Sequence, residues 1–252
     1  MGSALDTGQI EEVIEKNILR TPTERRTLMD RVPQPSDGHG SLRDIQVLVN
    51  RFPDMLTSKI KEKILIKSKR IDWVSPLKDD DYSEYRDSGF IEKLGRQDLK
   101  SALSAFWPRR GPQWDALGIG DGREYFLVEA KANIDEIVSP ETKAAGKSFE
   151  MIRSSLDGLR KYLNVNNKID WSGPFYQYTN RLAHLYFLRV LNKLSANLIF
   201  VYFIGDNSVS GPKTVDEWNA ALTVMKRYLG LGTHKLSKYT AEVFVDVKQI
   251  GS

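Results

Sequence analysis

The sequence predicts an α/β protein in which a mixed central β-sheet is flanked by helices, with a helical elaboration at the N-terminus. Two apolar segments, residues 125–128 and 198–204, have the continuous hydrophobicity of strands that are buried on both faces. Residues 243–247 carry valine at every second position, which indicates a further strand. Helical patterns lie before, between and after these strands, an order that is typical of a sheet covered by helices.

The composition bounds the class of protein. A chain of 252 residues can bury a full core, and 40% hydrophobic with 28% charged residues is typical of a soluble globular protein. No apolar stretch reaches the roughly 18 residues of a membrane-spanning helix, and the first residues lack a signal-peptide pattern. The absence of cysteine excludes disulfides and fits a cytoplasmic protein, and the lack of a long apolar stretch predicts no membrane partner. The net charge of +4 permits a nucleic-acid partner without requiring one, and nothing indicates an oligomeric state.

We divide the chain into a helical N-terminal region, residues 1–78, and a core domain, residues 79–252. Apolar residues at helical spacing predict two helices in the first region, one over residues 10–18 and one over residues 42–49 that ends before Pro53. A basic stretch follows: Lys59, Lys61, Lys63, Lys67, Lys69 and Arg70. This stretch is either a solvated helix face or a surface that contacts phosphates and releases their counterions.

The core domain is expected to begin with two short helices. Ser83 can cap a helix that runs to Leu94, and residues 98–106 form a second helix that Pro108 ends. A β-hairpin follows, with its turn at residues 120–122.

Three longer helices are predicted after the hairpin. The first begins at Ser139-Pro140, because proline is tolerated at the first helical position. Its apolar stripe has spacings of three and four and consists of Phe149, Ile152, Leu156, Leu159 and Leu163. The second helix covers residues 177–194. The third opens with a capping box at Thr214 and Glu217 and runs to about Leu229.

The residues with the most distinctive chemistry lie on the predicted hairpin. Asp115 is near its start, and Glu129 and Lys131 occupy alternate positions on the returning strand, so the last two point to the same face. Burying a carboxylate or an ammonium costs roughly several kcal/mol unless the group is paired or meets a metal. Two acids and a lysine that converge at the end of a core strand suit metal-assisted hydrolysis of phosphodiesters.

Asp115 followed by Glu129-Ala130-Lys131 resembles the PD-(D/E)xK nuclease superfamily, which has the restriction-endonuclease-like fold. The resemblance covers residues 82–204. The literal Pro-Asp pair is missing, since the chain reads Gly111-Pro112-Gln113-Trp114-Asp115, but the proline is no metal ligand in this family.

The resemblance implies a nuclease that depends on a divalent metal, with DNA favoured over RNA as the substrate. Asp115 and Glu129 would be metal ligands, the carbonyl of Ala130 would join them, and Lys131 would orient water and stabilise charge at phosphorus. An ammonium between two carboxylates stays protonated, which favours electrostatic stabilisation as the role of Lys131. With no cysteine and three scattered histidines, the ligands are oxygens, and these favour Mg²⁺ or Mn²⁺.

The family usually supplies another carboxylate from a helix before the hairpin. Glu84 is our choice, and three other acids compete with it: Asp87, Glu92 and Asp98. Gln177 resembles a glutamine that lies beside the metals in some superfamily members, although a capping or surface role fits equally. His184 is either a hydrogen-bonded core histidine or a member of the site.

Two further groups are candidates for contact with nucleic acid. Lys143 and Lys147 share a helix face near the end of the Glu129 strand, and they either contact phosphate or are solvated. The second group contains Trp107, Arg109, Arg110 and Trp114. These residues either stack on bases and grip phosphate or form a loop that tryptophan anchors to the core.

The hairpin register tests the nuclease hypothesis. A two-residue turn at Asp121-Gly122 would direct the side chains of Asp115 and Glu129 to opposite faces of the sheet. A three-residue loop at residues 120–122 would direct them to the same face. The hypothesis therefore requires an odd-length loop or a bulge.

Two other functions remain open. The chain could be a nuclease-fold module that binds nucleic acid or supports an assembly without catalysis, although a decayed site should have lost at least one member of the acid and lysine set. It could also be an enzyme, such as a glycosidase, in which two carboxylates perform acid–base chemistry, but the closely placed Lys131 disfavours that class.

Overall fold

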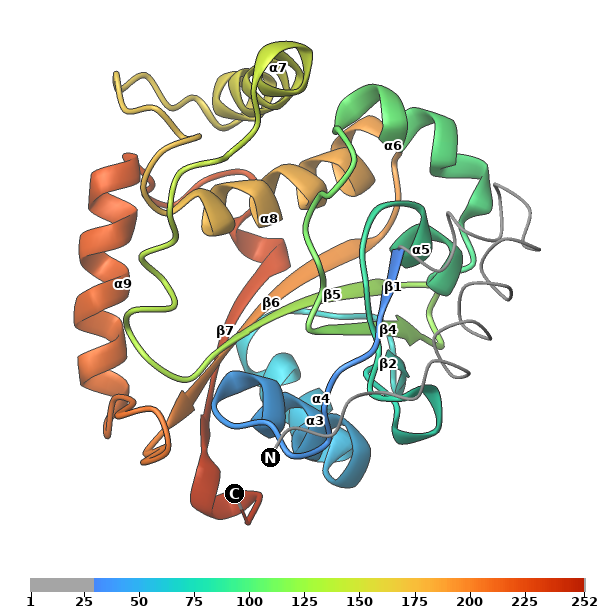
Figure 1. Cartoon of the computed structure of the whole chain (residues 1–252), viewed down its shortest axis with the longest axis vertical. Coiled ribbons are helices and arrows are strands. Elements are labelled where there is room, and N and C mark those ends of the chain that lie inside the picture. Colours follow the sequence, from blue (N-terminus) through green and yellow to red (C-terminus); the bar gives the residue numbers. More distant parts are fainter. Residues whose placement is uncertain (1–29, 252) are drawn as a thin grey trace, which may run out of the picture.

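The computed structural model describes residues 30–251, and a five-stranded sheet forms its centre (Figure 1). Along the sheet the strands are β2 (Ile71–Ser75), β4 (Ala116–Gly120), β5 (Tyr125–Lys131), β6 (Ala196–Ile204) and β7 (Thr240–Asp246). The pairs β2/β4 and β4/β5 are antiparallel, whereas β5, β6 and β7 run parallel. The predicted mixed sheet flanked by helices is confirmed. A separate two-stranded ribbon joins β1 (Arg31–Val32) to β3 (Glu84–Tyr85).

Helices cover both faces of the sheet. The first face packs on α3 (Ser41–Arg51) and α4 (Pro53–Lys63), which share a core with the even-numbered residues of β5. The second face lies under α5 (Asp87–Lys93), α6 (Lys100–Phe106), α7 (Gly146–Leu163), α8 (Tyr176–Tyr186) and α9 (Val215–Leu229). Short 3-10 turns occur at Lys78–Asp80, Gln97–Leu99, Ser237–Tyr239 and Val247–Gln249.

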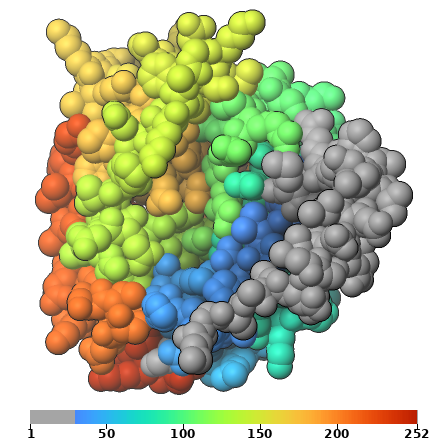
Figure 2. All heavy atoms as spheres, in the orientation of Figure 1, coloured from blue at the N-terminus to red at the C-terminus, as the bar shows by residue number. Residues whose placement is uncertain are grey.

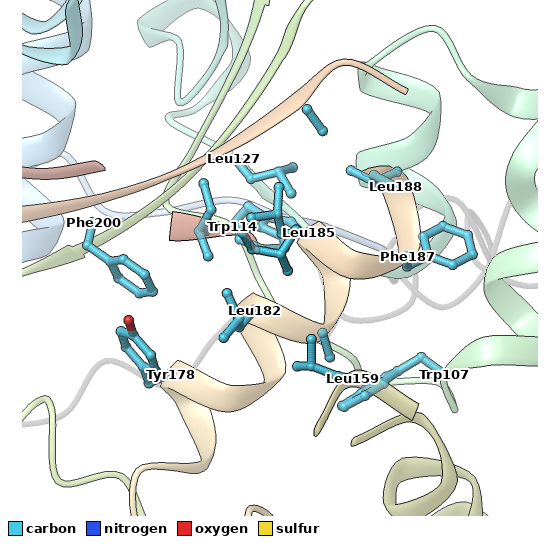
Figure 3. Packing of buried hydrophobic residues seen from close by; sticks show 14 of the residues in the cluster. Trp107, Trp114, Leu127, Leu159, Tyr178, Leu182, Leu185, Phe187, Leu188 and Phe200 are labelled. Atoms are coloured by element: carbon cyan, nitrogen blue, oxygen red, sulfur yellow. The ribbon is translucent and has the colours of Figure 1, made fainter. Parts of the chain in front are cut away.

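Helix α8 packs against the second face of the sheet. Its residues Tyr178, Leu182 and Leu185 are buried and point toward Leu127 of β5 and Phe200 of β6 (Figure 3). Each fully buried side chain of this size stabilises the fold by about 1.5–3 kcal/mol. Because side chains alternate along a strand, the face that carries Leu127 also carries Glu129 and Lys131 of β5.

Several predicted helices are confirmed, with shifted ends. The second N-terminal helix is α3, and the helix with the capping box is α9, where the Thr214 hydroxyl accepts a hydrogen bond from the Glu217 N–H at 3.2 Å. The helix expected from residue 177 is α8, and it continues into a π-helical turn at Phe187–Leu191.

Two predicted helix starts are wrong. Ser83 caps no helix, because the residues after it form β3, and α5 begins only at Asp87. Ser139-Pro140 opens no helix either, and α7 begins at Gly146. The intervening chain is instead held to α8, since the Ser139 hydroxyl accepts the N–H of Gln177 at 2.9 Å.

The N-terminal region is joined to the sheet more closely than its helical pattern indicated. Strand β2 was not predicted, and it forms one edge of the five-stranded sheet. The basic stretch belongs to α4 and the chain after it, on the first face of the sheet. The helix predicted over residues 10–18 lies outside the described residues. Within residues 30–251, no helix is both long and apolar enough to cross a membrane.

Candidate active site

The hairpin between β4 and β5 places Asp115 and Glu129 on one face of the sheet. Leu117 lies opposite Leu127, and the loop has three residues, 121–123, with Arg123 in the left-handed conformation at φ 56°. The predicted odd-length loop is confirmed, although it lies one residue later than residues 120–122. Asp115 precedes Leu117 by two positions and Glu129 follows Leu127 by two, so all four side chains share a face.

The Asp115 carboxylate is held at the edge of β5. Its Oδ2 atom accepts a hydrogen bond from the backbone N–H of Ala130 at 2.6 Å, and its own N–H donates to the Val128 carbonyl at 3.2 Å. Enclosure of the carboxylate, followed by the negative charges of Glu129 and Glu84, raises the pKa of Asp115 well above its usual value. The three carboxylates are therefore close enough to interact electrostatically.

Glu129 is the most tightly bound acid of the site. Its side chain is buried, and its two oxygens accept from Lys131 Nζ at 2.5 Å and from Arg181 Nε at 2.5 Å. Burial alone would raise the pKa of Glu129, but the charges of Arg181 and Lys131 outweigh that effect and lower it. Glu129 is therefore ionised between two cations.

Lys131 is buried on the same strand. Burial acts to lower its pKa, but the carboxylates of Glu129 and Asp115 outweigh this effect, and the net result is a raised pKa. The ammonium is therefore charged at neutral pH, which agrees with the electrostatic role expected from the sequence.

Arg181 of α8 was missed in the sequence analysis. Besides Glu129, its guanidinium donates to the Gln113 carbonyl at 2.8 Å and to Asn180 Oδ1 at 2.9 Å, and it lies 5.0 Å from the centre of the Trp114 ring. The sequence did carry a signal: Arg181 follows Tyr178 by three residues and precedes Leu185 by four, so it lies on the apolar face of a helix, where an unpaired charge is costly.

Glu84 lies in β3. It interacts electrostatically with Glu129 and is hydrogen-bonded to the side-chain amide of Gln113. Its Oε2 atom accepts from Gln113 Nε2 at 2.5 Å and from Gln34 Nε2 at 3.1 Å. Burial, the largest cause, together with the charge of Glu129, raises the pKa of Glu84 to about 7. The same Gln113 that binds Glu84 through its side chain binds Arg181 through its carbonyl.

The competing upstream acids are engaged elsewhere. Asp87 accepts the backbone N–H groups of Arg110 and Gly111, both at 2.9 Å. Glu92 pairs with Lys100, and Asp98 pairs with Arg96 at 2.6 Å. Glu84 is therefore the acid among the four that interacts with Asp115 and Glu129.

The remaining candidates divide between the core and a neighbouring cavity. His184 is buried among the rings of Phe90, Trp107 and Trp114, its Nδ1 is 2.9 Å from the Asn180 carbonyl, and burial lowers its pKa to about 3. Of the two alternatives for His184, the structure therefore supports the hydrogen-bonded core histidine and not a member of the site. Trp107 and Trp114 are buried as well, so the alternative of a loop that tryptophan anchors to the core holds for this group, while Arg109 and Arg110 are exposed.

The donor set fits a divalent cation in chemical type. All candidate ligands are oxygens, as Mg²⁺ and Mn²⁺ prefer, and the raised pKa values of Asp115 and Glu84 mark a concentration of negative charge that a cation would relieve. Among residues 30–251, however, no three acidic or histidine side chains are grouped closely enough to hold a metal ion. Each Glu129 oxygen already accepts from a cation, so Arg181 and Lys131 compete with a metal ion for this carboxylate.

Comparisons with known proteins assign the chain to no family. No family model matches the chain, and neither the curated proteins nor the solved structures yield a significant match. The resemblance to PD-(D/E)xK nucleases therefore rests on this chain's own residues.

Proposed function

We propose that this protein is a divalent-metal-dependent nuclease that hydrolyses phosphodiester bonds, with DNA favoured over RNA. The observation that carries the proposal is the grouping of Asp115, Glu129 and Lys131 at the end of β5, with Glu84 interacting from β3. A restriction-endonuclease-like core is part of the same proposal. The lack of cysteine supports a cytoplasmic location.

Each residue of the site would perform a different part of the hydrolysis. Asp115, Glu129 and the Ala130 carbonyl would hold the cation, which when bound supplies neutralisation of the phosphate charge and orientation of water. Lys131 places a fixed positive charge where negative charge develops on the phosphate oxygens. Glu84, with a pKa of about 7, suits transfer of the proton that water loses as its oxygen bonds to phosphorus. The P–O bond to the leaving oxygen breaks, and that oxygen takes up a proton.

Cleavage assays test this proposal directly. Plasmid and single-stranded DNA are incubated with wild type and with Lys131→Ala in Mg²⁺, Mn²⁺ and EDTA. We expect cleavage that requires metal and that Lys131→Ala reduces by at least about 100-fold, because a preorganised charge at the transition state is lost. Lys161→Ala serves as the control, since this lysine on α7 is exposed and lies outside the lining of the neighbouring cavity. Cleavage in EDTA, or equal cleavage by Lys131→Ala, would refute the proposal.

A non-catalytic nuclease-fold module is the alternative, and one observation favours it. The two cations on Glu129 satisfy that carboxylate without a metal. The same assays separate the alternatives, because a binding module yields cleavage products with none of the metals.

A further inference from the structure

A cavity of about 610 Å³ opens next to Arg181 and Gln113, the residues that contact Glu129 and Glu84. Residues 107–113 form one wall, residues 139–145 form the other, and α8 forms the floor. Figure 2 shows this face, with the orange atoms of α8 recessed between yellow-green and green atoms. Its volume falls in the range of about 300–1,000 Å³ that is typical of sites for small ligands.

The charges around this cavity are mainly positive. Arg109, Arg110, Lys143 and Arg181 line it, against the single acid Glu141. Arg110 and Lys143 are exposed, and within the described part of the chain neither side chain has an ion pair. Solvated cations that converge on one cavity attract an anionic ligand such as a phosphodiester.

The wall that carries Arg110 is preorganised. The Asp87 carboxylate accepts the N–H groups of Arg110 and Gly111, and Arg110 has a φ of 64°. A non-glycine residue in this left-handed region persists where its surroundings hold it, and such positions cluster at ligand sites. Asp87 therefore fixes the loop that presents Arg110 to the cavity.

Aromatic and amide groups complete the cavity next to the charged residues. The accessible ring is that of Tyr176, which is only partly buried; it lies 6.5 Å from the buried Trp107 ring, with planes 17° from parallel. Gln177 and Asn180 offer side-chain amides beside these rings. An aromatic surface with nearby cations is the combination that binds the bases and backbone of a single strand.

The floor of the cavity connects to the acid site through Arg181. One side of its guanidinium holds Glu129 at 2.5 Å, while the residue also lines the cavity. A phosphate that enters the cavity and contacts Arg181 therefore lies one side chain away from Glu129.

We propose that this cavity binds an unpaired nucleotide next to the bond that is cleaved, so that the substrate is a single-stranded nucleic acid. The inference rests on the proposed nuclease function. The cavity lies between two loops and offers a ring and amides for a base as well as cations for a phosphate, whereas in a duplex the base faces are stacked and unavailable.

Binding assays test the inference without catalysis. Fluorescence anisotropy in EDTA compares a labelled single-stranded DNA with a blunt hairpin duplex, for wild type and for the double variant Arg110→Gln/Lys143→Gln. We expect wild type to bind the single strand at least tenfold more tightly than the duplex. The double variant should weaken single-strand binding at least tenfold and flatten its logarithmic salt slope by about 1.4, the value for two lost phosphate contacts.

The control carries the same loss of charge elsewhere. Lys161→Gln/Lys168→Gln removes two exposed lysines that lie outside the cavity, and it should bind as wild type does. Equal affinity of wild type for single strand and duplex, or equal loss in the two double variants, would overturn the inference, as would an absence of binding to both DNAs.

The proposed function and this inference fail in different ways. Metal-dependent cleavage of duplex with no cleavage of single strand retains the nuclease and overturns the single-strand site. Single-strand binding that the double variant weakens, without cleavage in any metal, retains the cavity as a binding site and refutes the nuclease.

Discussion

Arg181 and Lys131 hold one buried carboxylate, that of Glu129, from two sides. Burying these ions is costly, and their mutual attraction offsets the cost only while the partners remain in place. Within residues 30–251, Asp115 and Glu84 have no direct cation partner, so burial and the neighbouring carboxylates raise the pKa of each, whereas the two cations on Glu129 lower its pKa. At the scale of single residues, the site is an electrostatic network in which each charged group shifts the pKa values of its neighbours.

Removal of Arg181 should therefore weaken the fold and free Glu129. Arg181→Met is expected to lower the free energy of unfolding in EDTA by about 3 kcal/mol, the lower end for a broken buried pair, because Lys131 remains. It should also bind Mn²⁺ more tightly than wild type in calorimetric titration, since Glu129 Oε2 becomes available. Arg153→Met, an exposed arginine on α7, is the control and should change neither quantity. Unchanged stability of Arg181→Met would contradict this account of the network.

Glu84 should make stability depend on pH in a defined window. Its pKa of about 7 lies above the value of an unfolded glutamate, so the folded state binds the proton more strongly. The stabilisation is complete below the unfolded pKa and is lost as pH rises through about 7. The difference in unfolding free energy between wild type and Glu84→Gln should thus fall by up to about 3 kcal/mol as pH rises from about 4.5 to 7. Denaturant titrations in EDTA measure it, and a rising or flat difference would contradict the shift.

At the scale of elements, the side chains of β2 fit beside β4 because β4 has a glycine, Gly118, at its centre. A Cβ atom on Gly118 would lie 2.7 Å from Ile71 Cγ2 and 3.0 Å from the Trp73 ring. The unpredicted edge strand β2 thus depends on a missing side chain in its neighbour. Strand β4 in turn carries the chain directly from Asp115 into the three-residue loop.

Gly118→Ala should destabilise the protein by about 1–3 kcal/mol, the usual cost of overpacking a filled core. Gly232→Ala is the matched control, because no atom lies within 4 Å of its added Cβ. It should be neutral or stabilising by less than about 1 kcal/mol. Chemical denaturation of both variants provides the measurement, and similar values for the two would show that β2 tolerates the extra methyl group.

At the scale of the whole molecule, the sheet separates the basic stretch from the acid site. Helix α4 packs on the first face, whereas Glu129 and α8 lie on the second. The chain after α4 is fixed at the far end of the hairpin, where the Glu124 carboxylate accepts the N–H groups of Lys67 and Ser68, both at 2.7 Å. Glu124 and Glu129 are five positions apart along the chain, which corresponds to about 17 Å in an extended strand.

This separation predicts that the basic stretch does not contribute to binding at the site. The triple variant Lys63→Glu/Lys67→Glu/Lys69→Glu should leave the salt slope of single-stranded DNA binding unchanged, because all three lysines are exposed and distant from the cavity. Anisotropy titrations at several salt concentrations measure the slope. A flatter slope would instead assign these lysines to a phosphate-contacting surface.

The sequence alone determined the features that depend on local periodicity and chemistry. Strand alternation placed Glu129 and Lys131 on one face, and the capping box placed the start of α9. The apolar runs identified β5 and β6. These features follow from neighbouring residues, so they can be predicted without knowledge of the remaining fold.

The tertiary structure alone decided which distant groups meet. Arg181 reaches Glu129 only because α8 packs across β5, and Glu84 was selected over Asp87 because the chain before α5 forms β3. The turn residues of the hairpin are compatible with a loop of two or three residues. The structure has the three-residue loop, in a hairpin whose strands β4 and β5 also pair with β2 and β6. Such outcomes depend on contacts between segments far apart in the chain, where burial and charge pairing override local preference.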